Sequence, residues 1–149
     1  MPNSIEEIGL EAFYNCDALI MNFIINASGL KTFKTNAFYN TSNLTLSSLP
    51  ENLVTIEGGA LREEPGGKSN FELISFPVSI ETIGARAFYG RTFNGLLDLS
   101  ACVNLKDWND ETNTGINADA FYNTYGITTI KLPKGSSLTV PENRWQAGP

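Results

Sequence analysis

One polar stretch contains the residues best suited to binding a metal ion. Residues 107–115 read Asp-Trp-Asn-Asp-Glu-Thr-Asn-Thr-Gly, and Asp119 follows shortly after. Hard cations bind several carboxylate and carbonyl oxygens, and this stretch contains such oxygens. It lacks the alternating acidic spacing of a calcium loop. A solvated loop is therefore the better interpretation, and we expect no metal site.

The two cysteines, Cys16 and Cys102, are the next candidates for chemistry. In the repeat described below they stand about three strand spacings apart, roughly 14 Å. A disulfide needs Cα atoms within about 7 Å of each other. We predict that the two are not bonded and that both are small buried apolar residues.

Aromatic residues recur at one position of the chain and form a third candidate site. Tyr14, Tyr39, Tyr89 and Tyr122 each follow a phenylalanine, and Arg62 takes the corresponding place once. Aromatic surfaces can bind sugar rings, which would make this column a glycan site. The alternative is that the rings and the guanidinium pack on one another.

The composition argues against an enzyme and against several classes of partner. The 149 residues include no histidine, which removes the commonest general base and a common metal ligand. The net charge of −6 disfavours nucleic acid and anionic membrane surfaces. No apolar run is long enough to span a bilayer. We expect a non-enzymatic protein without cofactors, nucleic-acid binding or membrane insertion.

An internal repeat must position these residues. Ala-Phe-Tyr occurs at 12–14, 37–39, 87–89 and 120–122, and Ala60-Leu61-Arg62 is a degenerate copy. The alanines at 12, 37, 60, 87 and 120 are therefore 25, 23, 27 and 33 residues apart. Four residues before each alanine stands a bulky apolar residue: Ile8, Phe33, Ile56, Ile83 and Ile116. Such spacing indicates a stack of similar units.

Each unit is interpreted as a short strand, a proline turn, a second short extended piece and a turn that carries Ala-Phe. Proline lacks an N–H group, so Pro50, Pro77 and Pro133 mark strand ends. Units of this size cannot bury their apolar side alone, whereas stacked units can. Equivalent strands should then pair in parallel. One internal column should contain Phe13, Phe38, Leu61, Phe88 and Phe121.

The first unit carries the most complete copy of the pattern. Residues 2–19 read Pro-Asn-Ser-Ile-Glu-Glu-Ile-Gly-Leu-Glu-Ala-Phe-Tyr-Asn-Cys-Asp-Ala-Leu, and residues 77–88 repeat most of it. This pattern resembles the BspA-like leucine-rich repeats over roughly residues 2–133. The chain departs from it at Thr41 and Thr124, which replace the cysteine, at Leu61, and in an insertion between Trp108 and Ile116.

The resemblance implies a fold and a setting. We expect a β-rich α/β solenoid, a right-handed leucine-rich-repeat superhelix with a short parallel sheet on one face and turns or short helices on the other. It would form one domain over residues 1–149, with units at about 2–26, 27–49, 50–76, 77–101 and 102–133 and a partial unit at 134–149. Relatives are mainly surface-exposed or secreted proteins of host-associated bacteria and some protists, used for adhesion and protein binding.

A binding face follows from the alternation of side chains across a strand. Counting from the prolines through the short apolar runs gives a set of outward residues: Phe23, Leu46, Ser48, Leu73, Ser75, Asp98, Ser100, Thr129 and Lys131. The first three apolar members would form a patch, and such patches mark interactions. A register error of one residue would instead place these side chains inside.

The leading functional hypothesis is a non-catalytic adhesion or protein-binding module of a cell-surface or secreted protein, which contacts a host or partner protein. A structural spacer that displays other domains and a glycan-binding module are the alternatives. Residues 134–149 begin another unit but do not reach Ala-Phe. We therefore expect either a fragment of a longer protein or self-association through a solenoid end or the strand face.

Overall fold

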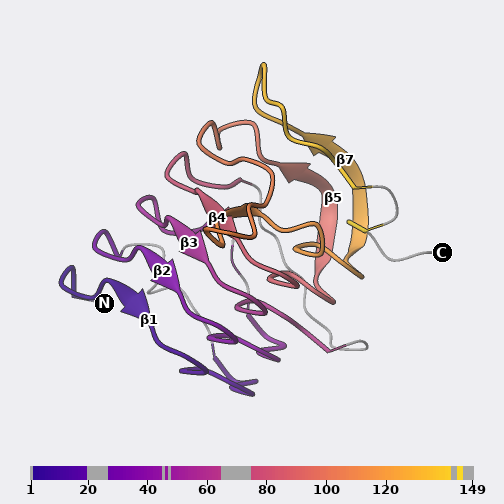
Figure 1. Ribbon diagram of the computed structural model, residues 1–149. Helices are drawn as coiled ribbons and strands as arrows, with labels where there is room; N and C mark the ends of the chain where they lie inside the picture. Colours follow the sequence, from indigo (N-terminus) through magenta and orange to yellow (C-terminus); the bar gives the residue numbers. More distant parts are fainter. Residues whose placement is uncertain are drawn as a thin grey trace.

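The computed structural model describes residues 2–19, 27–44, 46, 48–64, 75–141 and 144–145. Similar coils of chain stack side by side, each shifted along one axis from the coil before it (Figure 1). The strands are β1 (Glu7–Ile8), β2 (Thr32–Phe33), β3 (Thr55–Ile56), β4 (Thr82–Ile83), β5 (Thr92–Asp98), β6 (Gly115–Ile116) and β7 (Tyr125–Lys131).

The short strands form a parallel five-stranded sheet in the order β1-β2-β3-β4-β6. The second residue of each strand is the apolar residue four positions before alanine, and each is buried: Ile8, Phe33, Ile56, Ile83 and Ile116. The predicted parallel pairing of equivalent strands is confirmed. Two residues suffice for each inner strand, because β2, β3 and β4 pair with an equivalent strand on both sides (Figure 1).

The position of this sheet differs from the expectation. The runs that follow the Ala-Phe turns were expected to supply the strands. Within the described residues, the runs of the fourth and fifth units do so, as β5 and β7, which form a separate two-stranded parallel sheet. Residues 44, 46, 48 and 49 of the second unit are not in a strand. Insertions change the length of these runs between units, whereas the apolar strand residue stands four positions before alanine in all five units.

The Ala-Phe turns join the units through a second set of backbone bonds. The N–H of Phe13 donates to the carbonyl of Ala37 at 2.8 Å, and the N–H of Phe38 donates to Ala60 at 2.8 Å. The bond from Phe88 to Ala120 measures 2.9 Å. The alanines at 37, 60, 87 and 120 are fully buried. A small side chain is needed here because it permits the close approach of two backbones.

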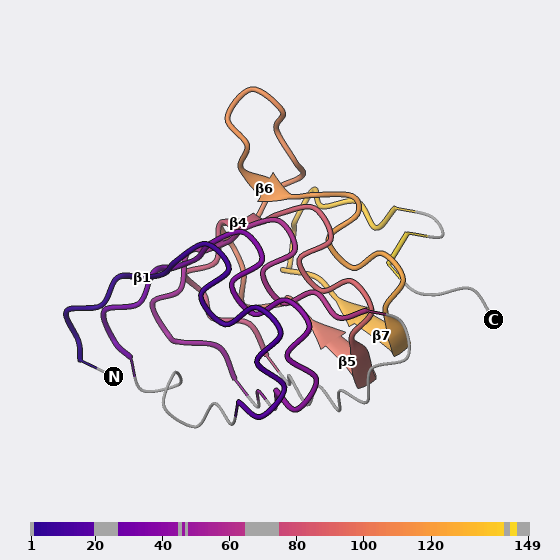
Figure 2. The same cartoon turned by 90° about the horizontal axis from the view of Figure 1, so that it is seen from below.

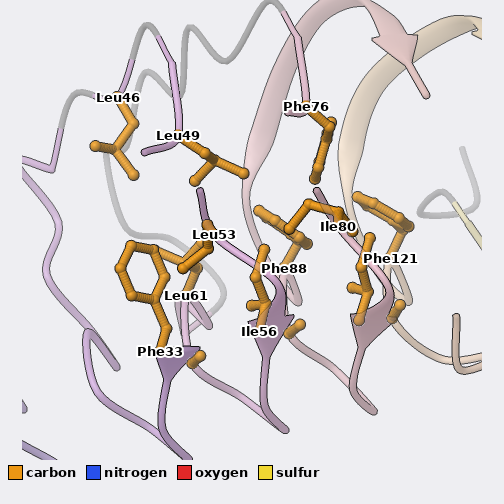
Figure 3. Close-up of a cluster of buried hydrophobic side chains, with 14 of the residues drawn as sticks. Phe33, Leu46, Leu49, Leu53, Ile56, Leu61, Phe76, Ile80, Phe88 and Phe121 are labelled. Carbon is orange, nitrogen blue, oxygen red and sulfur yellow. The ribbon is translucent and has the colours of Figure 1, made fainter. Parts of the chain in front are cut away.

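The residues after alanine form the internal column that the repeat predicts. Phe13 stacks on Phe38 with ring centroids 5.3 Å apart, and Phe88 stacks on Phe121 at 4.9 Å. Leu61 holds the equivalent position in the third unit and is fully buried; Figure 3 shows it in the same cluster as Phe88 and Phe121. Phe13 is only partly buried because no other described coil covers its outer side. Offset stacking adds to the burial of these large rings.

A buried ion pair lies beside this column, and the sequence analysis did not anticipate it. Arg91 Nη1 lies 3.1 Å from Glu63 Oε2, and neither side chain is exposed. Arg91 also donates to the backbone carbonyls of Leu61, Thr41 and Phe38. Burial lowers the pKa of Arg91 to about 10, while Glu63 opposes this shift. Arg91 therefore stays charged at neutral pH and holds three successive units together.

Trp145 covers the last complete unit. Its ring lies 5.2 Å from Phe121 and continues the internal column, and only 3% of the residue is exposed. Its indole N–H donates to the carbonyl of Ala118, and Thr124 Oγ1 donates to the carbonyl of Trp145. Arg144 pairs with Asp119 beside it. Residues 144–145 thus pack on the fifth unit through Trp145, in place of a ring from an Ala-Phe turn.

The burial of Leu46 gives a first test of this arrangement. Leu46 has no exposed surface, so Leu46→Asp should place an unpaired carboxylate in the core. We expect a loss in the free energy of unfolding similar to that of Phe88→Ala, about 3–5 kcal/mol, measured by urea denaturation. Thr129→Asp on the exposed strand β7 is the control and should stay within about 0.5 kcal/mol. An unchanged midpoint for Leu46→Asp would show that this side chain faces solvent.

The ion pair gives a second test. Arg91→Met should leave the Glu63 carboxylate buried without its cation and cost about 3–5 kcal/mol of unfolding free energy. Adding Glu63→Leu should recover part of this loss, because the orphaned charge is removed with its partner. Urea denaturation of both single variants and the double variant measures the coupling. Losses that simply add would mean that the two groups do not depend on each other.

Candidate binding surface

Four of the expected surface residues come together on β5, β7 and the turn after β5. Asp98 lies opposite Lys131 in the strand pairing, and Lys131 Nζ is 3.7 Å from Asp98 Oδ2. The hydroxyl and N–H of Ser100 both donate to Asp98 Oδ1, at 2.6 and 3.0 Å. Thr129 is exposed one alternation before Lys131. These residues form an ordered polar surface, here called the ribbon face.

The electrostatics of the ribbon face are set by local bonds. The side-chain hydrogen bond from Ser100 and then its backbone bond hold the pKa of Asp98 below its usual value, and Lys131 adds to this effect. Asp98 is therefore ionised at neutral pH. Lys131 is more exposed than Asp98, so the pair contributes little to stability. Its charges remain accessible to a partner.

The opposite side of the ribbon belongs to the core. Phe93, Leu97 and Ile127 are buried, whereas Leu96 is half-buried opposite Thr129. The pairing shifts register at Gly95, where φ is +85°. Side chains therefore alternate between the core and the surface along β5 and at the end of β7. These are the segments in which the sequence analysis expected Asp98, Thr129 and Lys131 to point outward.

The apolar end of the expected face is not found. Leu46 is fully buried, so the prediction that it points outward is wrong. The described residues of its run, 44, 46, 48 and 49, are not in a strand. The rule that side chains alternate between the two faces applies only inside a strand. Ser48 is half-buried and Ser75 is exposed, but neither lies in β5 or β7. Phe23 and Leu73 lie outside the described residues.

The tyrosine positions form a continuous stack along the outside of the turns. Tyr14 and Tyr39 stack with centroids 4.6 Å apart. The Arg62 guanidinium lies 5.2 Å from the Tyr39 centroid and 4.8 Å from that of Tyr89. Tyr89 and Tyr122 follow at 6.0 Å. The interpretation as mutual packing is confirmed, and the stacked ring faces are occupied by neighbours rather than open to a sugar.

Glu64 fixes the centre of this stack. Its Oε1 accepts hydrogen bonds from the Tyr39 hydroxyl and from Arg62 Nη2. The bond to Glu64 raises the pKa of Tyr39 to about 12, and burial adds to the shift. The tyrosine therefore remains a neutral donor. Arg62 replaces a ring without breaking the column because it is planar and cationic.

The polar insert between Trp108 and Ile116 forms an ordered loop that projects beside β6 (Figure 2). The aspartates in and beside this loop have separate partners. The Asp107 carboxylate accepts bonds from the N–H and hydroxyl of Thr139, and Asp110 accepts the indole N–H of Trp108. Asp119 pairs with Arg144 instead. Within the described ranges, no three Cys, Asp or Glu side chains gather as metal ligands.

The two cysteines are both free. Cys102 is buried, and burial, with a smaller effect of Asp98, raises its pKa to about 12. Cys16 is exposed, so the prediction that it is buried is wrong. The equivalent Thr41 is fully buried beneath the neighbouring unit, whereas no described coil lies over Cys16.

In the part of the chain that is described, no helix is long and apolar enough to cross a membrane.

The comparison with protein families covers nearly the whole chain. The model of the BspA type leucine rich repeat region matches in six copies, over residues 1–93 and 97–144. No curated protein and no solved structure gives a significant match. Repeats of this kind generally mediate protein binding and are typically non-catalytic. The parallel five-stranded sheet and the stacked Ala-Phe turns agree with this match, and the chain belongs to the BspA-type leucine-rich repeat family.

Proposed function

We propose that this protein is a non-catalytic adhesion or protein-binding module that contacts a partner protein through the ribbon face. The observation that carries the proposal is the length and exposure of the ribbon. β5 and β7 have seven residues each, whereas every other strand has two. Seven-residue strands present a continuous row of side chains, and two-residue strands do not.

The chemistry of the ribbon face suits a polar protein surface. Asn94, Thr129 and Lys131 are exposed beside Asp98, so both signs of charge and several hydrogen-bonding groups are available. Polar complementarity of this kind gives specificity and orientation. The row holds Asp98 in place through Ser100, which lowers the entropy lost on binding. A host protein is the partner class that follows from a cell-surface or secreted location.

The surface location is part of the same proposal. Proteins of the BspA-type family are often surface-associated or secreted in bacteria. A net charge of −6 and the absence of histidine disfavour nucleic acid and the usual catalytic systems. A glycan-binding module is less well supported, because the stacked tyrosine faces are covered by one another. A purely structural spacer would need no ordered polar face, and the test below separates it.

Substitution of the ribbon face tests the proposal. Lys131→Glu and Thr129→Arg should each weaken binding to immobilised extracellular-matrix proteins at least tenfold, which corresponds to about 1.4 kcal/mol. Biolayer interferometry measures the affinity, and thermal unfolding should stay unchanged because both sites are exposed.

Glu111→Arg, at an exposed position of the projecting loop, is the matched control and should bind as the unaltered chain does. Equal affinity of all three variants would refute the ribbon face as the contact surface. No measurable binding by the unaltered chain, across matrix proteins and cell-surface extracts, would favour the spacer.

A further inference from the structure

The boundary between the fourth and fifth units differs from the others in its backbone bonds. At the other boundaries, the residue two positions before the buried strand residue donates its N–H to the carbonyl of the equivalent residue in the preceding unit. These bonds run from Lys31 to Glu6, from Val54 to Lys31 and from Glu81 to Val54. At this boundary the Glu81 carbonyl accepts from Gly115 at 3.2 Å. Ile116 in turn donates to the carbonyl of Lys106 at 2.7 Å. The Gly115–Ile116 peptide therefore lies between Glu81 and Lys106.

The insert thus adds an extra row to the sheet. β6 pairs with β4 on one side, and Ile116 also forms a parallel bridge with Asp107. Glu81 and Lys106 would lie on neighbouring rows without the insert. With it, their backbones are about two strand spacings apart, or roughly 9.6 Å. Gly115 makes this possible, since its φ is +93° and an added Cβ would lie 2.7 Å from the Lys106 carbonyl oxygen.

The separation prevents an ion pair of the kind found at the boundary between the first and second units. Glu6 and Lys31 hold the positions equivalent to Glu81 and Lys106, and their charged groups are 3.6 Å apart. Of the ion pairs found among the described residues, none joins Glu81 to Lys106. Opposite charges therefore flank this boundary without contacting each other.

A hollow of about 320 Å³ lies between them. Its walls are polar and contain no aromatic ring: Glu81, Asn104, Lys106, Asp107, Asn109, Thr114 and Gly115. Two of these side chains are held in place. The Asp107 carboxylate accepts from the N–H of Thr139, and Asn109 Oδ1 accepts from the N–H of Glu111. The volume suffices for a small organic molecule.

We propose that this hollow binds a small zwitterion, such as a free amino acid or a short ω-amino acid. The ammonium group of the ligand lies by Glu81 and Asp107, and its carboxylate lies by Lys106. The ligand thereby replaces the Glu–Lys contact that the extra row removes. A sugar would leave these charges unmatched and would find no aromatic face, and a simple amine would leave Lys106 unmatched. The site is independent of the ribbon face.

A series of zwitterions of increasing length tests the proposal. Heteronuclear NMR of the full chain would follow the amides of Lys106, Thr114 and Gly115 during titration with glycine, β-alanine, γ-aminobutyrate and ε-aminocaproate. We expect saturable shifts at millimolar concentration, because exposed ion pairs are individually weak, and a maximum affinity at one length. Butylamine, butyrate and glucose should bind at least tenfold more weakly, which corresponds to about 1.4 kcal/mol.

Matched charge removals locate the ligand. Glu81→Gln and Lys106→Gln should each lower the affinity at least tenfold, whereas Glu6→Gln and Lys31→Gln, at the ion-paired boundary, should leave it unchanged. An absence of saturable shifts with every zwitterion overturns the proposal. An equal response to glucose or butyrate does so as well, as does equal binding by the Glu81→Gln and Glu6→Gln variants. The probe series decides the matter even where a variant is poorly folded.

Discussion

The close contact of backbones at the buried alanines determines the rest of the structure. The N–H after alanine in one unit bonds to the alanine carbonyl of the next, at 2.8–2.9 Å. A larger side chain at Ala37, Ala60, Ala87 or Ala120 would push the units beyond this distance. Because the bond fixes both spacing and register, each side chain stacks on its equivalent in the next unit. The phenylalanine column, the tyrosine stack and the buried isoleucines are consequences of that one constraint.

A different residue type can replace the usual one at a repeat position when the backbone conformation there also differs. The third residue after alanine has a positive φ at Asn15, Asn40, Gly90 and Asn123, a conformation that asparagine and glycine adopt most easily. Glu63 holds this place in the third unit without a positive φ, and its side chain is buried. Arg91, at the cysteine position of the next unit, meets it there. Two departures from the repeat thus compensate each other across a unit boundary.

The same logic explains which features could be predicted from the sequence. Positions at a constant distance from alanine were placed correctly, including Ile56, Phe88 and the tyrosine stack, because stacking needs only equivalence. The five-stranded sheet lies four residues before the alanines, not in the runs before the prolines. These runs vary in length between units, and a shift of one residue turns a side chain to the other face. That is why Leu46 proved buried, while Asp98 and Lys131, inside true strands, were oriented correctly. The ion pair between Arg91 and Glu63 could not be predicted, because it depends on the backbone conformation at Glu63, which the residue pattern does not reveal.

The insertion shows how such a solenoid accommodates variation. On the turn side the central bond of the backbone ladder is kept, since the N–H of Phe88 donates to the carbonyl of Ala120 at 2.9 Å. The neighbouring N–H of Arg86 donates to Asp119 at 3.0 Å, one residue beyond the carbonyl that is equivalent at the other boundaries. On the sheet side the added residues form an extra row, which Gly115 makes sterically feasible. The units therefore separate only where side chains are polar and solvated, and the core keeps its packing. A boundary of this kind can gain a hollow at little cost to the fold, because the contact that it replaces is an exposed ion pair worth about 0–1 kcal/mol.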